Sequence, residues 1–246
     1  MKQTEDKNKA SPHSLNEWVQ AFTLLGFAIY LLFLLMSGNL AHYINLRFTW
    51  LIVLAMGSFG ILGIYKSWIL IQRKHEHHAH SVGWMGIFIM LAPLLIAMIV
   101  PSQPLGYEAI VDGVSSRIIN DSGVVRMMIR PEERTILDWS RELNLVNNSY
   151  AFDGQMVDVI GFIYREPQFK AGDFMLSRFT ISCCVAEAVA IGLPARGNAS
   201  EPLEDGQWVR VQGKMQSGEF DGMVVPIIQV DSIDSIPVPD KPYLYH

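Results

Sequence analysis

Uncharged, mostly apolar residues fill three long stretches in the first hundred positions of the chain. The stretches without Asp, Glu, Lys or Arg are Trp18–Leu46, Phe48–Tyr65 and Ser81–Tyr107. About 20 apolar residues are enough to cross a bilayer as a helix. The densest parts therefore predict three transmembrane helices, at Val19–Ser37, Phe48–Ile71 and Gly83–Val100.

Tryptophan placement supports these spans, because indole rings favour the membrane–water interface. Four of the six tryptophans lie near predicted helix ends, at Trp18, Trp50, Trp68 and Trp84. A cleaved signal peptide followed by two spans is the alternative. The first apolar run is longer than the roughly 7–15 residues of a signal-peptide core, and no clear small-x-small cleavage site follows it.

Positive charges around the spans predict the orientation of the chain. The N-terminus and the second loop carry Lys2, Lys7, Lys9, Arg73 and Lys74, with Lys66 at the helix end, whereas the first loop carries Arg47. The positive-inside rule places the richer side in the cytoplasm. Three spans then put the remainder of the chain outside the cytoplasm, at the plasma membrane.

The pattern of apolar positions changes in the second half of the chain. Pro131-Glu132-Glu133 is typical of a helix start, with Ile136, Trp139, Ser140 and Leu143 on its inner face. From Asp153 the apolar positions alternate with period two, which predicts strands. The expected strands are Tyr107–Val111 (weak), Val124–Ile129, Met156–Glu166, Phe174–Cys183, Ala188–Pro194, Trp208–Met215 and Met223–Asp231, with a turn at Gly218–Gly222.

The five later strands suggest a small closed barrel of OB-like type. The predicted fold class is a multi-pass membrane protein, α+β, with three N-terminal transmembrane helices and a β-rich OB-like barrel domain that carries one amphipathic helix. The expected divisions are a cytoplasmic N-terminus at 1–17, a transmembrane domain at 18–100 with a His-rich loop at 73–82, and an extracytoplasmic domain at 101–246.

Composition and charge exclude several classes of function. The chain is 50% hydrophobic and 17% charged, which excludes intrinsic disorder. Residues 1–100 carry a net charge of +3 and residues 101–246 one of −8, so nucleic acid is not an expected partner. Residues 101–245 contain no His, no G-x-S-x-G elbow and no P-loop, so we expect no enzyme activity.

Four histidines and a carboxylate cluster in the second loop, within His75-Glu76-His77-His78-Ala79-His80. Imidazole suits divalent transition metals such as Zn, so His75, His77, His78 and His80 are candidate metal ligands. A pH-sensitive patch and a simple polar helix end are the alternatives. No cofactor beyond such a metal is expected.

Two further groups of residues could carry chemistry. Cys183 and Cys184 could bind a thiophilic metal or act in redox chemistry if the chain turns there; otherwise alternation sends Cys183 inward as a buried thiol and Cys184 outward. Arg178, Glu187 and Arg196 could form a ligand face, with ordinary rim ion pairs as the alternative.

The second predicted span carries a seam of small residues, formed by Gly57, Gly60, Gly63 and Ser67. Small residues let another helix backbone approach closely inside a membrane. The seam predicts either packing on the first or third helix of the same chain or docking of a separate membrane protein.

The segment Ser177–Pro194, SRFTISCCVAEAVAIGLP, resembles the signature of the YcgQ-like family of permease subunits. That family shows R-F, then C-C, then A-[DE]-A, after an N-terminal helical membrane part. Thr135–Leu143 and Val225–Pro237 also resemble it, and the layout matches over nearly the whole chain. Glu187 departs from the more common Asp; it keeps the carboxylate but lengthens its reach.

The resemblance implies an accessory, non-catalytic subunit of a two-gene permease. The expected partners are a larger multi-span permease subunit and the lipid bilayer, with a metal or metalloid-related substrate as one option. An independent membrane-tethered module that binds ligand on the barrel is the alternative. A thiol-dependent redox enzyme that uses Cys183 and Cys184 is a third hypothesis.

Overall fold

The computed structural model describes most of the chain and divides it into two compact units. The described residues are 12–72, 84–100, 102–111, 130–146, 148–197 and 203–245. One unit consists of Met1–Leu40 and Leu46–Gln103, and the other of Ala41–Asn45 and Pro104–His246. The short segment between the first two helices therefore belongs to the same unit as the second half of the chain.

Three apolar helices form the first unit: α1 (Pro12–Ser37), α2 (Thr49–Gln72) and α3 (Trp84–Ile99). The 3-10 turns η1 (Asn39–His42) and η2 (Leu46–Phe48) lie between α1 and α2. By length and composition, α1 and α2 could each cross a membrane, over Asn16–Ser37 and Leu46–Gln72, whereas the apolar part of α3, Phe88–Ile99, is shorter. Each helix coincides with one of the three predicted spans.

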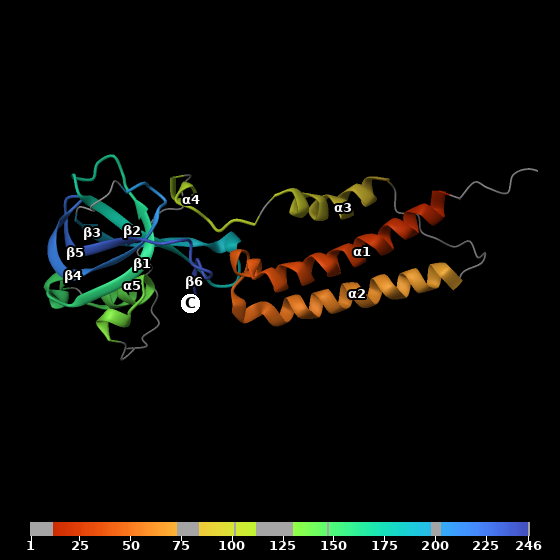
Figure 1. Cartoon of the computed structure of the whole chain (residues 1–246), viewed down its shortest axis with the longest axis horizontal. Coiled ribbons are helices and arrows are strands. Elements are labelled where there is room, and N and C mark those ends of the chain that lie inside the picture. Colours follow the sequence, from red (N-terminus) through yellow and green to blue (C-terminus); the bar gives the residue numbers. More distant parts are fainter. Residues whose placement is uncertain are drawn as a thin grey trace, which may run out of the picture. The chain divides into compact units, whose positions relative to one another are not determined.

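The second unit contains a closed barrel of five strands with both parallel and antiparallel pairs (Figure 1). Its strands are β1 (Met156–Tyr164), β2 (Asp173–Ile181), β3 (Val189–Arg196), β4 (Trp208–Phe220) and β5 (Met223–Ser235), with a short β6 (Leu244–Tyr245) beside β2. β1 pairs with both β2 and β4, β2 with β3, and β4 with β5, all antiparallel. A short parallel contact closes the barrel, where Ala195 and Arg196 of β3 meet Ile228 and Gln229 of β5.

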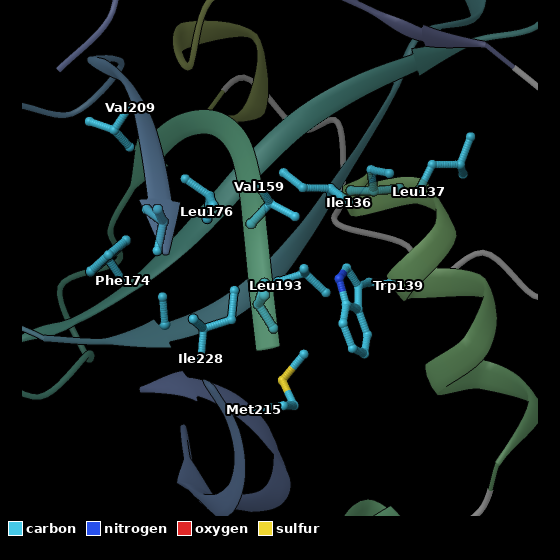
Figure 2. Close-up of a cluster of buried hydrophobic side chains, with 14 of the residues drawn as sticks. Ile136, Leu137, Trp139, Val159, Phe174, Leu176, Leu193, Val209, Met215 and Ile228 are labelled. Atoms are coloured by element: carbon cyan, nitrogen blue, oxygen red, sulfur yellow. The ribbon is translucent and has the colours of Figure 1, made fainter. Parts of the chain in front are cut away.

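Apolar side chains from all five strands and from α5 (Ile136–Leu145) fill the barrel interior. Figure 2 shows Ile136 and Trp139 of α5 directed toward Val159 and Leu193 of the barrel wall. Thr135 starts this helix with a capping box that pairs its side chain with Asp138. The amphipathic helix predicted from the sequence therefore packs its apolar face onto the barrel core.

A second apolar cluster covers part of the outer face of the barrel wall. Phe162, Phe179 and Trp208 lie on the outer face of β1, β2 and β4, with Phe162 stacked on Phe179 at 5.6 Å between ring centroids. Ile110 of the short helix α4 (Glu108–Val111) and Tyr243 before β6 pack onto them. β2 is consequently apolar on both faces, since Phe174 and Leu176 point into the interior.

Several predicted boundaries were wrong, for local reasons. Residues 108–111 form the helix α4 instead of a strand, and Pro131–Glu133 is a separate 3-10 turn before α5. Gly218 lies within β4, and the chain reverses at Asp221-Gly222, where both residues have positive φ. An Asp-Gly pair favours such a two-residue hairpin turn. β5 runs on to Ser235, and the Val124–Ile129 prediction lies outside the described residues.

Candidate functional site

The two cysteines lie in a turn that ends β2. The strand stops at Ile181, and the 3-10 turn η5 (Val185–Glu187) follows at once. The Glu187 carboxylate accepts hydrogen bonds from the backbone N–H groups of Cys183 and Cys184. Both thiols are free, with Cys183 exposed and Cys184 partly buried. The expectation of an inward, buried Cys183 was therefore wrong, because strand alternation ends two residues earlier.

Glu187 also controls the chemistry of this turn. Hydrogen bonding to the Glu187 carboxylate and to Cys184 raises the pKa of Cys183 to about 11. The backbone N–H of Cys183 lowers the pKa of Glu187 below its usual value. At neutral pH Cys183 is therefore a protonated thiol and a poor nucleophile. Among the described residues no group of three or more His, Cys, Asp or Glu side chains is arranged to hold a metal ion.

The Cys-Cys turn also binds the segment Ala41–Asn45 through its backbone. Asn45 donates its backbone N–H to the carbonyl of Cys183 at 2.9 Å and its side-chain amide to that of Ser182 at 2.8 Å. Val185 donates its N–H to the carbonyl of Tyr43 at 2.9 Å, and Ile44 forms an antiparallel bridge with Cys184. Asn45 is buried, so these hydrogen bonds are shielded from water.

Tyr243 gives the same segment a second attachment. Its buried hydroxyl accepts the N–H of Leu105 at 2.8 Å and lies 3.3 Å from the carbonyl of His42, to which it donates. Burial raises the pKa of Tyr243, so the hydroxyl stays protonated and can donate. One side chain therefore joins the segment after α1, the start of the barrel unit and the C-terminal tail.

The three residues of the predicted ligand face have separate partners and do not converge. Arg196 forms a bidentate ion pair with the buried Asp173, with 2.9 Å between Nη2 and Oδ2. Arg178 lies over the Trp208 ring and donates to the carbonyls of Lys241 and Pro242. Arg178 lies in the second half of β2, opposite Ile191 of β3, whereas Arg196 lies opposite Asp173 at the start of β2. Each side chain stabilises the fold locally.

A cavity of about 430 Å³ opens instead beside the gap between β3 and β5, between the outer face of β2 and β3, the second half of α5 and the 3-10 turn η4 (Ser149–Phe152). Its lining includes Met175 and Ser177 of β2 and Gly192 of β3. The β1–β2 loop contributes Glu166 and Phe169, and the β4–β5 turn contributes Asp221. Sequence analysis missed this cavity; the available signal was the run of small side chains at alternate positions of β3, beginning with Ala190 and Gly192.

The glycine seam of α2 has two different environments. A Cβ on Gly63 would lie 2.8 Å from the Leu25 side chain of α1, and one on Gly60 would lie 4.0 Å from Ala28. A Cβ on Gly57 would meet nothing within 4 Å. Ser67 donates its hydroxyl to the carbonyl of Gly63. The Gly63 end therefore packs on α1, while Gly57 is open in this chain.

The histidine cluster His75–His80 lies outside the described residues, so its metal-binding role remains a prediction.

Comparison with known families assigns the chain. The DUF1980 N-terminal domain matches residues 19–112, and the DUF1980 C-terminal domain matches residues 119–246. The chain therefore belongs to the DUF1980 family, with the helices and the barrel in its two domains.

Two relatives align over most of the chain. It is 23% identical to the "Putative two-component membrane permease complex subunit" of Streptococcus mutans serotype c (strain ATCC 700610 / UA159), over 92% of this chain and 98% of that protein. It is 20% identical to the "UPF0703 protein YcgQ" of Bacillus subtilis (strain 168), over 90% of this chain and 97% of that protein. No solved structure matches. The predicted YcgQ-like family is confirmed.

Proposed function

We propose that this protein is a non-catalytic accessory subunit of a two-component membrane permease, anchored by three spans with its barrel outside the cytoplasm. The relative from Streptococcus mutans, which aligns over nearly its whole length, carries the name of such a subunit. That name supports a second subunit as partner, and we assign the partner as a larger multi-span permease. The strand order around the barrel supports an OB-like domain.

The attachment of Ala41–Asn45 to the Cys-Cys turn is the observation that carries this topology. This segment joins α1 to α2, and it hydrogen-bonds to the barrel unit. If α1 and α2 both span, the barrel lies on the membrane side where the α1–α2 segment emerges. The chain leaves that side through α2, so α3 must cross back before the barrel begins.

The length of α3 is compatible with a third crossing. Sixteen helical residues extend about 24 Å, somewhat less than a hydrocarbon core of about 30 Å. Local thinning of a bilayer can accommodate a short span, and a proline such as Pro93 of α3 is tolerated inside transmembrane helices in general. Lys and Arg near the N-terminus and the second loop support a cytoplasmic position for those segments, and with three spans a position outside the cytoplasm for the barrel.

The open face of α2 is the proposed contact with the larger subunit. Val53, Gly57, Ile61 and Ile64 recur at helical spacing on one face. The three aliphatic side chains are 44%, 70% and 65% exposed, and Gly57 leaves room for a close helix approach. Exposed apolar side chains around a small residue fit a partner helix as well as lipid.

Replacing Gly57 with Leu tests this contact, and Gly63→Leu is the matched comparison on the same helix. We expect Gly57→Leu to abolish co-purification of the partner membrane protein in mild detergent while α1 and α2 remain packed. Gly63→Leu should instead disturb α1–α2 packing, because the new side chain overlaps Leu25. Unchanged co-purification with Gly57→Leu would remove this face from the proposal.

The cytoplasmic histidine loop is proposed to bind a divalent metal such as Zn. Binding requires neutral imidazole, so retained metal should fall as the pH drops through about 6.5. Changing His75, His77, His78 and His80 together to Ala should remove most metal found at pH 7.5, whereas Cys183→Ser with Cys184→Ser should not. Metal analysis that shows the reverse would move the site to the barrel.

A membrane-tethered ligand-binding module is the second candidate function. The cavity on β2 and β3 favours it, because this face and its adjoining loops are where OB-like barrels bind ligands. A purified chain that binds ligand and co-purifies with no partner membrane protein would support this alternative over the permease role.

A further inference from the structure

The cavity continues an apolar layer that is already part of the fold. Cross-strand register places Ser177 opposite Gly192 and Phe179 opposite Ala190, on the outer face of β2 and β3. Phe179 is covered by the second apolar cluster and does not line the cavity, Ala190 belongs to that cluster and also lines the cavity, and Ser177 and Gly192 line the cavity only. The same wall is thus covered over one half and left open over the other.

Two contacts hold the far side of the cavity in place. Phe169 of the β1–β2 loop packs on Phe220 at the end of β4, with 4.9 Å between ring centroids. Lys170 and Glu219 form an ion pair at 3.0 Å beside them. Because these contacts join the loop to the hairpin, the cavity walls are preorganised before a ligand enters.

The strand edges at the cavity argue against an added peptide strand. In the described ladders β3 meets β5 only at Ala195 and Arg196, so the preceding parts of both strands have unpaired edges. Pro194 of β3 and Pro226 of β5 line this gap, and neither has an N–H to donate. Proline blunts a strand edge against strand addition. A small molecule is therefore the better occupant.

The charges at the cavity are of one sign. Glu166 and Asp221 line it, and no Lys or Arg is found among its described lining residues. The nearby cations Lys170 and Arg196 are engaged by Glu219 and Asp173. Burial and the neighbouring Glu166 raise the pKa of Tyr164, so its hydroxyl stays neutral at the cavity wall. Two carboxylates beside an apolar floor complement a cation with an apolar body.

We propose that this cavity binds a small amphipathic cation, with its apolar part against Met175 and Gly192 and its ammonium group near Asp221 and Glu166. This inference goes beyond the permease role and does not depend on it. The ligand class differs from the anion that Arg178 and Arg196 would have favoured, because those guanidinium groups are held elsewhere.

Three probes with one apolar body test the proposal: 4-phenylbutylamine, 4-phenylbutanol and 4-phenylbutyrate. Each is titrated against the full-length protein in phosphatidylcholine nanodiscs by saturation-transfer NMR, with empty nanodiscs as the lipid control. We expect the amine to bind most tightly and the carboxylate most weakly. Equal binding of all three, or binding no greater than that of empty nanodiscs, would overturn the proposal.

Two variants locate the binding. Asp221→Asn keeps a residue type that suits the hairpin turn. It should weaken binding of the amine about threefold and leave binding of the alcohol unchanged. Asp231→Asn, an exposed change outside the cavity, is the matched control. It should change the binding of neither the amine nor the alcohol. Gly192→Val should weaken binding of the amine and of the alcohol about tenfold, because the new Cβ would meet Met175 and Ser177. If Gly192→Val does not fold, Asp221→Asn decides alone; unchanged amine binding in that variant contradicts the site.

Discussion

The helical unit and the barrel unit handle their apolar side chains in opposite ways. In the barrel, large apolar residues gather in two clusters, one inside the wall and one on its outer face. In the helices many remain exposed, such as Met36 at 79% and Ile99 at 78%. Exposure of so much apolar helix surface to water is unfavourable, so lipid or a partner helix is needed to cover it.

This difference predicts where a substitution is costly. Trp139 is fully buried in the barrel core, so Trp139→Ala should lower the free energy of unfolding of the barrel by about 4 kcal/mol. Trp50 is 60% exposed on α2, and Trp50→Ala should leave barrel unfolding unchanged. Thermal or denaturant unfolding of both variants in the same detergent measures the contrast. Similar losses for both would show that the two units unfold as one.

Ion pairs extend the comparison of buried and exposed side chains to charged residues within the barrel. Asp173 is 3% exposed, so Arg196→Ala leaves a carboxylate buried without its charge partner and should cost about 3 kcal/mol. Arg210 pairs with Asp158 at the surface, and Arg210→Ala should cost less than about 1 kcal/mol. The comparison is made between the denaturant unfolding midpoints of the two variants, provided that the slope of each transition is unchanged. An equal loss of stability for the two variants would mean that the burial of Asp173 does not determine how much its ion pair contributes.

The smallest expected effect concerns Cys183, whose substitution or labelling should barely change stability. Its pKa of about 11 leaves roughly a hundredfold less thiolate at pH 8 than the ordinary value of 9.0 would. In a Cys184→Ser background, alkylation of Cys183 should therefore be slow at pH 8 and accelerate as the pH rises toward 11. Glu187→Gln should lower the pKa of Cys183 and speed its labelling at pH 8. Mass spectrometry can follow this labelling. Fast labelling without that substitution would contradict the role of Glu187.

Local patterns predicted much of this fold. The three apolar runs correspond to α1, α2 and α3, and period-two alternation found the five barrel strands. Val209, Val211 and Met215 of the predicted strand Trp208–Met215 are buried, in keeping with that alternation. Boundaries were less reliable where a polar residue did not mark a turn. Ser217 and Gly218 continue β4, because β5 pairs with them across the hairpin.

Contacts between distant parts of the chain were not predictable from local patterns. Nothing in the sequence of Ala41–Asn45 indicates that it pairs with the Cys-Cys turn about 140 positions later. The YcgQ-like resemblance singled out the Cys-Cys pair, but the predicted strand ran on to Cys183, and the hydrogen bonds of the turn depend on where the chain folds back. The cavity likewise depends on the divergence of β3 from β5, which only the barrel closure determines.

The side of the membrane on which the barrel lies is the central claim, and cysteine labelling tests it most directly. In a Cys183→Ser, Cys184→Ser background, single cysteines are placed at Asp240 in the barrel unit and at Ala79 in the second loop. Intact cells are treated with a membrane-impermeant maleimide. We predict labelling at position 240 and none at position 79 until the membrane is permeabilised; equal labelling of the two positions, or labelling at 79 alone, would contradict the account.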